Sequence, residues 1–101
     1  MFLVMAYVLD EEKARRSLSS IFKSSEFYLE SNKIIVSKSR VESASFLKLL
    51  DLNYQVSGMI KISIIKEDGE YENLYHYNTK ISVNEKDEVE SCDTIYLNKL
   101  V

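Results

Sequence analysis

Residues 26–58, EFYLESNKIIVSKSRVESASFLKLLDLNYQVSG, predict a β-hairpin that continues directly into an amphipathic helix. In the hairpin, Phe27 and Leu29 alternate with polar residues, and the apolar pattern restarts at Ile34 after Asn32-Lys33. Asparagine tolerates the positive φ angles that a two-residue turn requires. We therefore expect two short antiparallel strands joined at Asn32-Lys33.

The second half of this stretch predicts a helix from Ser39 to about Gln55. Its apolar residues share one broad face, which comprises Ala44, Phe46, Leu47, Leu49, Leu50, Leu52 and Tyr54. Gly58 would be the C′ residue after this helix, because glycine adopts the left-handed conformation without a Cβ penalty. The breadth of the face predicts contacts with more than one neighbour.

Upstream, the apolar run Phe2–Leu9 predicts a strand that is buried on both faces. Asp10 follows at an N-cap position, and the next two residues are glutamates that would meet the positive end of a helix dipole. A first helix is therefore predicted over residues 11–23. Its apolar stripe comprises Ala14, Leu18, Ile21 and Phe22.

Downstream, alternating isoleucines at 60, 62 and 64 and an Asp68-Gly69 turn predict a second hairpin, followed by short strands over 81–83 and 94–97. The returning strand of the hairpin carries Tyr71, Tyr75 and Tyr77. The predicted fold class is α+β: an antiparallel sheet with two helices on one face, built from a β-α-β-β-α core and a β-rich C-terminal extension. We expect a single domain over residues 1–101, with the core at 1–58 and the extension at 59–101.

The composition indicates a folded domain with unevenly distributed charge, since 46% of the 101 residues are hydrophobic and 29% are charged. The net charge is −3, but residues 1–50 carry +2 and residues 51–101 carry −5. The first half is therefore the better candidate for contact with nucleic acid, with ordinary solvated faces as the alternative. The single Cys92 argues against a disulfide framework, and the apolar N-terminus is too short to span a membrane, so we expect a cytoplasmic protein without membrane contact.

The sequence contains no motif for catalysis, metal binding or a cofactor. His76 and Cys92 cannot supply the three or four ligands of a zinc site, and no third residue marks them as a nucleophile pair. The two glycines, Gly58 and Gly69, are isolated, which excludes a glycine-rich phosphate loop. We therefore expect no enzymatic activity, no metal and no cofactor. The acidic residues around Gly69 lack the spacing of a calcium loop and are interpreted as a solvated hairpin tip.

Three short segments give the first half of the chain a resemblance to a known family. They are Tyr7-Val-Leu-Asp-Glu-Glu12, Lys33-Ile-Ile-Val-Ser-Lys38 and Glu42-Ser-Ala-Ser-Phe-Leu-Lys48. In their order and spacing, residues 2 to about 57 resemble the Pcc-type small subunit of the KEOPS complex, which installs threonylcarbamoyl-adenosine in tRNA. The last segment is similar to the family's acidic-Ser-x-Ala-Leu-Arg helix opening, with Ala44 and Ser45 in swapped order and Lys48 shifted by one residue. A divergent paralogue would show such departures.

The resemblance implies a non-catalytic accessory subunit that forms a homodimer or heterodimer with a Pcc-type partner, joins the other KEOPS subunits and assists tRNA binding. Lys48 lies on the family motif, and charge adds four further candidates for tRNA contact: Lys38, Arg40, Arg15 and Arg16. The candidates for partner binding are apolar or aromatic: Phe46, Leu49, Leu50, Tyr54, Tyr71 and Tyr75. The alternative is a small ferredoxin-like interaction or regulatory protein, viral or host, that acts through its acidic, tyrosine-rich C-terminal strands.

Overall fold

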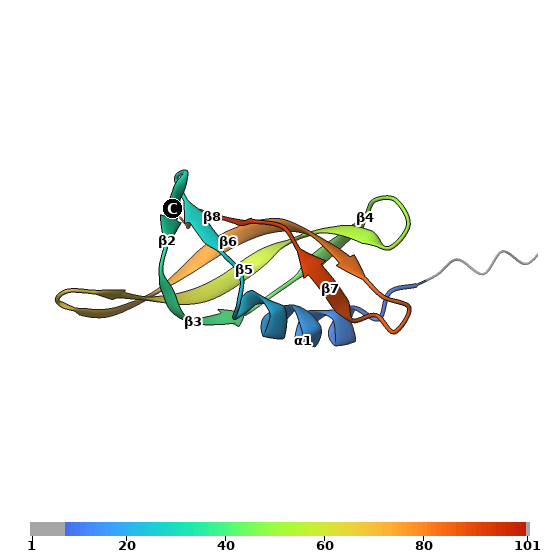
Figure 1. Cartoon of the computed structure of the whole chain (residues 1–101), viewed down its shortest axis with the longest axis horizontal. Helices are drawn as coiled ribbons and strands as arrows, with labels where there is room; N and C mark the ends of the chain where they lie inside the picture. Colours follow the sequence, from blue (N-terminus) through green and yellow to red (C-terminus); the bar gives the residue numbers. More distant parts are fainter. Residues whose placement is uncertain (1–7, 101) are drawn as a thin grey trace, which may run out of the picture.

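The computed structural model describes residues 8–100, which form one helix and eight strands (Figure 1). The helix is α1 (Glu11–Phe22). The strands are β1 (Phe27–Leu29), β2 (Asn32–Ile34), β3 (Val36–Val41), β4 (Ser45–Lys48), β5 (Asn53–Lys66), β6 (Gly69–Val83), β7 (Val89–Cys92) and β8 (Ile95–Lys99). Most of the strand predicted over Phe2–Leu9 lies outside the described residues, and Val8 and Leu9 form neither helix nor strand.

All eight strands belong to one curled sheet of order β2-β1-β8-β6-β5-β3, in which β4 also pairs with β5 and β7 also pairs with β6 (Figure 1). The sheet is mixed, because β1 runs parallel to β8 while the other pairs are antiparallel. The chain passes from β2 to β3 through Ile35 alone, although these strands stand at opposite ends of the strand order. The curl of the sheet therefore brings its two ends together at Ile35.

The central pair of strands, β5 and β6, carries two interrupted partner strands. β3 and β4 follow one another along β5, where residues 42–44 oppose the two residues between Ser57 and Ile60. β7 and β8 follow one another along β6 in the same way, and residues 93–95 oppose residues 79–80. Each interruption is a bulge of three residues against two, and such bulges bend a strand and increase its twist. They explain how long strands produce a curled sheet.

Helix α1 fills the concave side of this sheet. The Oδ1 atom of Asp10 accepts a hydrogen bond from the backbone N–H of Lys13 (3.2 Å), which caps the first turn. Ala14, Leu18 and Phe22 are fully buried, and the Phe22 ring meets Tyr77 edge-on at 5.4 Å. The core around them comprises Phe27, Val41, Tyr54, Val56, Ile60, Ile62, Tyr75, Ile81, Val83, Ile95 and Leu97.

The helix predicted over 39–55 is absent, and the predicted fold class with two helices on an antiparallel sheet is wrong. These residues form β3, β4, the turn after β4 and the start of β5. Long-range pairing with β5 overrides the helical spacing, and serine is a weak helix former because its hydroxyl competes for backbone hydrogen bonds. Leu47 and Leu50 on the predicted apolar face are instead 65% and 79% exposed. Gly58 lies inside β5 rather than after a helix, so the predicted division at 58/59 falls within one strand.

Other local predictions match the structure more closely. α1 begins at the predicted residue, and the hairpin of β5 and β6 turns at Glu67 and Asp68, between the paired residues Lys66 and Gly69. The first hairpin exists, but its turn lies at Glu30 and Ser31 (φ 51° and 68°) instead of Asn32-Lys33. Residues 81–83, predicted as a short strand, form the end of β6. In the predicted strand 94–97, residues 95–97 belong to β8.

Among the described residues, no helix has the length and hydropathy required to cross a membrane.

Burial of Tyr77 predicts loss of stability at alkaline pH. Desolvation raises the pKa of the Tyr77 hydroxyl far above its usual value of about 10. Below about pH 10 the hydroxyl is neutral in both the folded and the unfolded chain, so its full contribution is present. As the pH rises above about 10, the unfolded chain releases this proton while the folded chain retains it, and the free energy of unfolding falls.

Urea unfolding at a series of pH values between about 8 and 11 measures this effect. Tyr77→Phe is the matched variant, because phenylalanine has no proton to release. We expect the stability of the variant to depend less steeply on alkaline pH than that of the wild type. Identical slopes for the two proteins would contradict the prediction.

Candidate functional site

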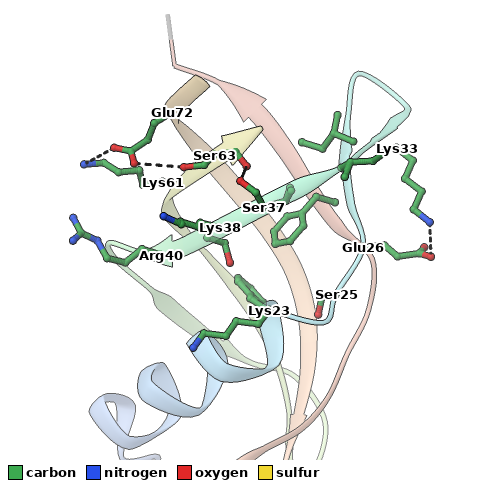
Figure 2. A pocket seen from close by; sticks show the side chains of 16 residues that line it. Lys23, Ser25, Glu26, Lys33, Ser37, Lys38, Arg40, Lys61, Ser63 and Glu72 are labelled. Atoms are coloured by element: carbon green, nitrogen blue, oxygen red, sulfur yellow. Dashed lines mark hydrogen bonds and ion pairs between the residues drawn. The ribbon is translucent and has the colours of Figure 1, made fainter. Parts of the chain in front are cut away.

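A cavity of about 730 Å³ lies beside the join between β2 and β3 (Figure 2). Its walls come from the C-terminal end of α1, from β1, from residues 33–40 and from the facing part of β5 and β6. The apolar part of the lining comprises Phe22, Phe27, Ile34, Ile35 and Val36. Ligand pockets typically have volumes of about 300–1,000 Å³, so this cavity has the size of a binding site, and it combines an apolar part with several charged groups.

The charged side chains of the cavity are mainly basic. Five cations line it, Lys23, Lys33, Lys38, Arg40 and Lys61, against two carboxylates, Glu26 and Glu72. Figure 2 shows Lys23, Lys38, Arg40 and Lys61 on one side, whereas Lys33 and Glu26 pair with each other on the opposite side. The net charge of the lining is therefore +3, and the excess is concentrated on one side.

Three of these cations form ion pairs with carboxylates. Lys33 Nζ lies 3.0 Å from Glu26 Oε1, Lys61 Nζ lies 3.6 Å from Glu72 Oε1, and Arg40 donates to Glu42 Oε1 at 2.7 Å. The hydrogen bond and charge of Lys33 lower the pKa of Glu26, and those of Arg40 lower the pKa of Glu42. Glu26 and Glu42 therefore stay ionised at neutral pH.

The structure brings together only two of the five predicted tRNA-binding residues. Lys38 and Arg40 lie on β3 at the cavity. Arg15 and Arg16 lie on α1 and Lys48 lies at the end of β4, and none of the three lines the cavity. Lys23 and Lys61 join the basic side of the cavity but were missed, because they come from separate elements and form no basic run in the sequence.

The predicted partner-binding residues are divided between the core and the surface. Tyr54 and Tyr75 are buried in the core, and Phe46 is half-buried with its ring edge-on to Tyr54 at 6.5 Å. Leu49 and Leu50 are exposed in the segment after β4, and neither lines the cavity. Tyr71 is exposed on the hairpin of β5 and β6.

The tip of this hairpin extends beyond the rest of the sheet (Figure 1). We define the arm as residues 65–74, of which residues 65–70 form the two-stranded tip and residues 71–74 continue β6 inward. The pairing of β3 with β5 ends at Ile64, and the pairing of β8 with β6 begins at Tyr75. Within residues 8–100, no strand therefore pairs with the outer edge of β6 along the arm. Three large apolar side chains are exposed there: Ile65, Tyr71 and Leu74.

The arm is strongly acidic, because its single cation, Lys66, stands against four carboxylates: Glu67, Asp68, Glu70 and Glu72. The Tyr71 hydroxyl donates to Asp68 Oδ2 at 2.5 Å, and Lys66 Nζ lies 5.3 Å from the centre of the Tyr71 ring. The hydrogen bond from Tyr71 lowers the pKa of Asp68, which keeps its charge at neutral pH. These contacts join the side chains of the tip to one another.

The remaining candidate chemistry is sparse. The described residues contain no group of three or more His, Cys, Asp or Glu residues arranged to hold a metal ion. The Cys92 thiol donates a hydrogen bond to the Asp93 carbonyl, in the bulge at residues 93–95. Burial raises the pKa of this thiol, which disfavours the reactive thiolate. Neither residue of the formal pair His76 and Cys92 lines the cavity.

The chain thus forms a single-helix, strand-rich scaffold with a basic cavity and an acidic arm. Comparison with known proteins gives no match to a family model, a curated protein or a solved structure.

Proposed function

We propose that the chain is a non-catalytic interaction protein of the cytoplasm that binds an extended, basic segment of a partner polypeptide along its arm. The observation that carries this proposal is the outer edge of β6 at residues 69–74, which no described strand pairs. An unpaired edge presents a row of backbone donors and acceptors, and a partner strand can satisfy them by extending the sheet.

The side chains of the arm support a specific partner. Many exposed edges are protected by lysine, proline or bulges, yet this arm has no proline and continuous pairing from Lys66 and Gly69 inward. Ile65 (62% exposed) and Tyr71 (41% exposed) offer apolar contact next to the edge. The net charge of −3 on the arm opposes pairing with the arm of a second copy and favours a basic segment.

Deletion of residues 67–101 cannot test this proposal, because it would remove β6 with the core residues Tyr75, Tyr77 and Ile81. The test is therefore confined to exposed side chains of the arm. We expect Glu67→Lys/Glu70→Lys and, separately, Tyr71→Lys/Leu74→Lys to weaken partner capture by at least about tenfold, since each removes charge or apolar complementarity. Affinity capture from native cells followed by quantitative mass spectrometry measures the loss.

A matched control is Glu85→Lys/Glu90→Lys, which makes the same charge change at exposed positions of the turn after β6 and of β7. This control should retain the partner, and the thermal midpoint of each variant should confirm that it is folded. Capture that is equal in the wild type and both arm variants would refute the proposal. So would capture that the control loses to the same extent.

The second candidate is the accessory subunit of the KEOPS complex that the resemblance implies. It is favoured by the position of Lys38 and Arg40 beside Lys23 and Lys61, which gathers four cations on one side of the cavity. Against it, the motif segment Glu42–Lys48, which opens a helix in that family, here forms a bulge and β4. The same capture experiment separates the candidates, because this one requires KEOPS subunits among the captured proteins and retention after the arm is changed.

A further inference from the structure

Two lysines on the basic side of the cavity lack a carboxylate partner. Lys23 and Lys38 have no Asp or Glu oxygen within 4.0 Å among the described residues, whereas the other three lining cations each have one. The Lys23 ammonium group is also not needed to satisfy the last carbonyls of α1. The backbone N–H groups of Lys23, Ser24 and Ser25 and the hydroxyls of the two serines already donate to these carbonyls. Both ammonium groups are therefore available to an anion.

One part of the cavity is suited to an apolar body. Phe27, Ile34 and Val36 contribute to its lining, and Ile35 at the join of β2 and β3 is 80% exposed. An apolar group that covers this isoleucine would contribute favourable binding free energy of about 25 cal/mol for each Å² of apolar surface removed from water. The cavity thus combines a cationic side with a continuous apolar strip along residues 34–36.

We infer that the cavity binds a small amphipathic carboxylate, with its head between Lys23 and Lys38 and its aliphatic chain along Ile34, Ile35 and Val36. Glu72 of the arm also lines the cavity, but this inference does not depend on the function proposed for the arm. A charge-assisted hydrogen bond from an ammonium group is stronger than a neutral one, and the apolar strip selects for the chain.

Two other anions fit this cavity less well. A phosphate dianion would lie near the negative, C-terminal end of the α1 dipole, and no glycine-rich loop or helix N-terminus faces it with backbone N–H groups. A nucleic acid strand would meet the carboxylates around the opening, Glu26, Glu42, Glu70 and Glu72, at several of its phosphates. A single carboxylate beside Lys23 also lies near this end of α1, but it carries half the charge of the dianion and brings no further anion to the carboxylates around the opening.

Isothermal titration of the full chain with dodecanoate, below its micellar concentration, tests the inference. Dodecanol, inorganic phosphate and a short single-stranded RNA are titrated in parallel. We expect saturable one-to-one binding of dodecanoate and at least about tenfold weaker binding of dodecanol, because the alcohol lacks the charge. Tight binding of phosphate or RNA alone, or equal binding of dodecanol and dodecanoate, would overturn it.

Variants locate the ligand within the chain. Lys23→Gln/Lys38→Gln should weaken dodecanoate binding by at least about tenfold, and Ile35→Ser should weaken it severalfold. The matched controls make equivalent changes at exposed positions outside the cavity: Lys80→Gln/Lys86→Gln and Leu47→Ser. All four variants change exposed side chains, so circular dichroism should show that each is folded. Unchanged affinity in Lys23→Gln/Lys38→Gln would overturn the inference.

Discussion

Replacing Gly58 with alanine is expected to lower the free energy of unfolding by about 3 kcal/mol, which corresponds to a thermal midpoint at least about 12 °C lower for a domain of this size. A Cβ at position 58 would collide with the backbone of Ser43: it would lie 2.7 Å from the carbonyl carbon and even closer to the carbonyl oxygen. Backbone atoms cannot move aside as the end of a side chain can.

The position of Ser43 is fixed by several hydrogen bonds. The backbone N–H groups of Glu42 and Ser43 both donate to the Met59 carbonyl, at 2.9 and 3.2 Å, and the Ser43 Oγ atom accepts from Met59 N–H at 2.9 Å. The added methyl group must therefore break part of this network or bend β5. Chemical denaturation followed by circular dichroism measures the loss.

Two controls separate this collision from a general effect of changing β5 or a glycine. Ser57→Ala alters an exposed neighbour and should cost less than about 0.5 kcal/mol. Gly69→Ala meets no atom within 4 Å, but its φ of 144° disfavours a side chain, so we expect a loss of about 1–2 kcal/mol. If Gly58→Ala were no more destabilising than Ser57→Ala, the close approach of the two backbones would be contradicted.

Gly58 also shows why part of the fold could not be predicted from the sequence. A glycine after a run of leucines indicates a helix C-terminus. The local pattern does not distinguish this role from that of a strand glycine opposite a bulge in the neighbouring strand. The distinction depends on Ser43, fifteen residues earlier, whose carbonyl needs the space that a Cβ would fill. Where structure is decided by neighbouring residues, as at Asp10 and α1, the prediction holds.

The same contrast applies to the candidate site. The acidic hairpin tip follows from the short pattern around Gly69, and its turn is confirmed within one residue. The cavity could not be predicted, because Lys23 follows α1 as its C-cap residue, Lys38 and Lys61 belong to β3 and β5, and the three meet only when the sheet curls. Spacing in the sequence places them no closer together than any other lysines.

Replacing Tyr77 with alanine is expected to be the most destabilising single change, with a loss of about 3–5 kcal/mol. The Tyr77 side chain is 1% exposed, and its ring packs edge-on against Phe22 at the centre of the contact between α1 and the sheet. Its hydroxyl donates to the Ser43 carbonyl at 2.8 Å. A domain of this length has a total stability of about 5–15 kcal/mol, so this variant should be partly unfolded near physiological temperature.

Tyr77→Phe separates the ring from the hydroxyl. It keeps the ring packing and should cost about 1–2 kcal/mol, because the Ser43 carbonyl loses its buried donor. Tyr96→Ala removes a ring that is 59% exposed on β8 and should cost less than about 1 kcal/mol. Urea unfolding of the three variants ranks these losses, and a cost for Tyr77→Phe equal to that of Tyr77→Ala would show that the hydroxyl rather than the ring stabilises the core.

The Ser43 carbonyl links the changes at Gly58 and Tyr77, so their effects should not add. Alanine at position 58 displaces this carbonyl and therefore already weakens its hydrogen bond from Tyr77. The double variant Gly58→Ala/Tyr77→Phe should consequently lose less stability than the sum of the two single variants, by about 0.5–1 kcal/mol. Strict additivity would mean that the two changes act on separate parts of the core and are not coupled through the Ser43 carbonyl.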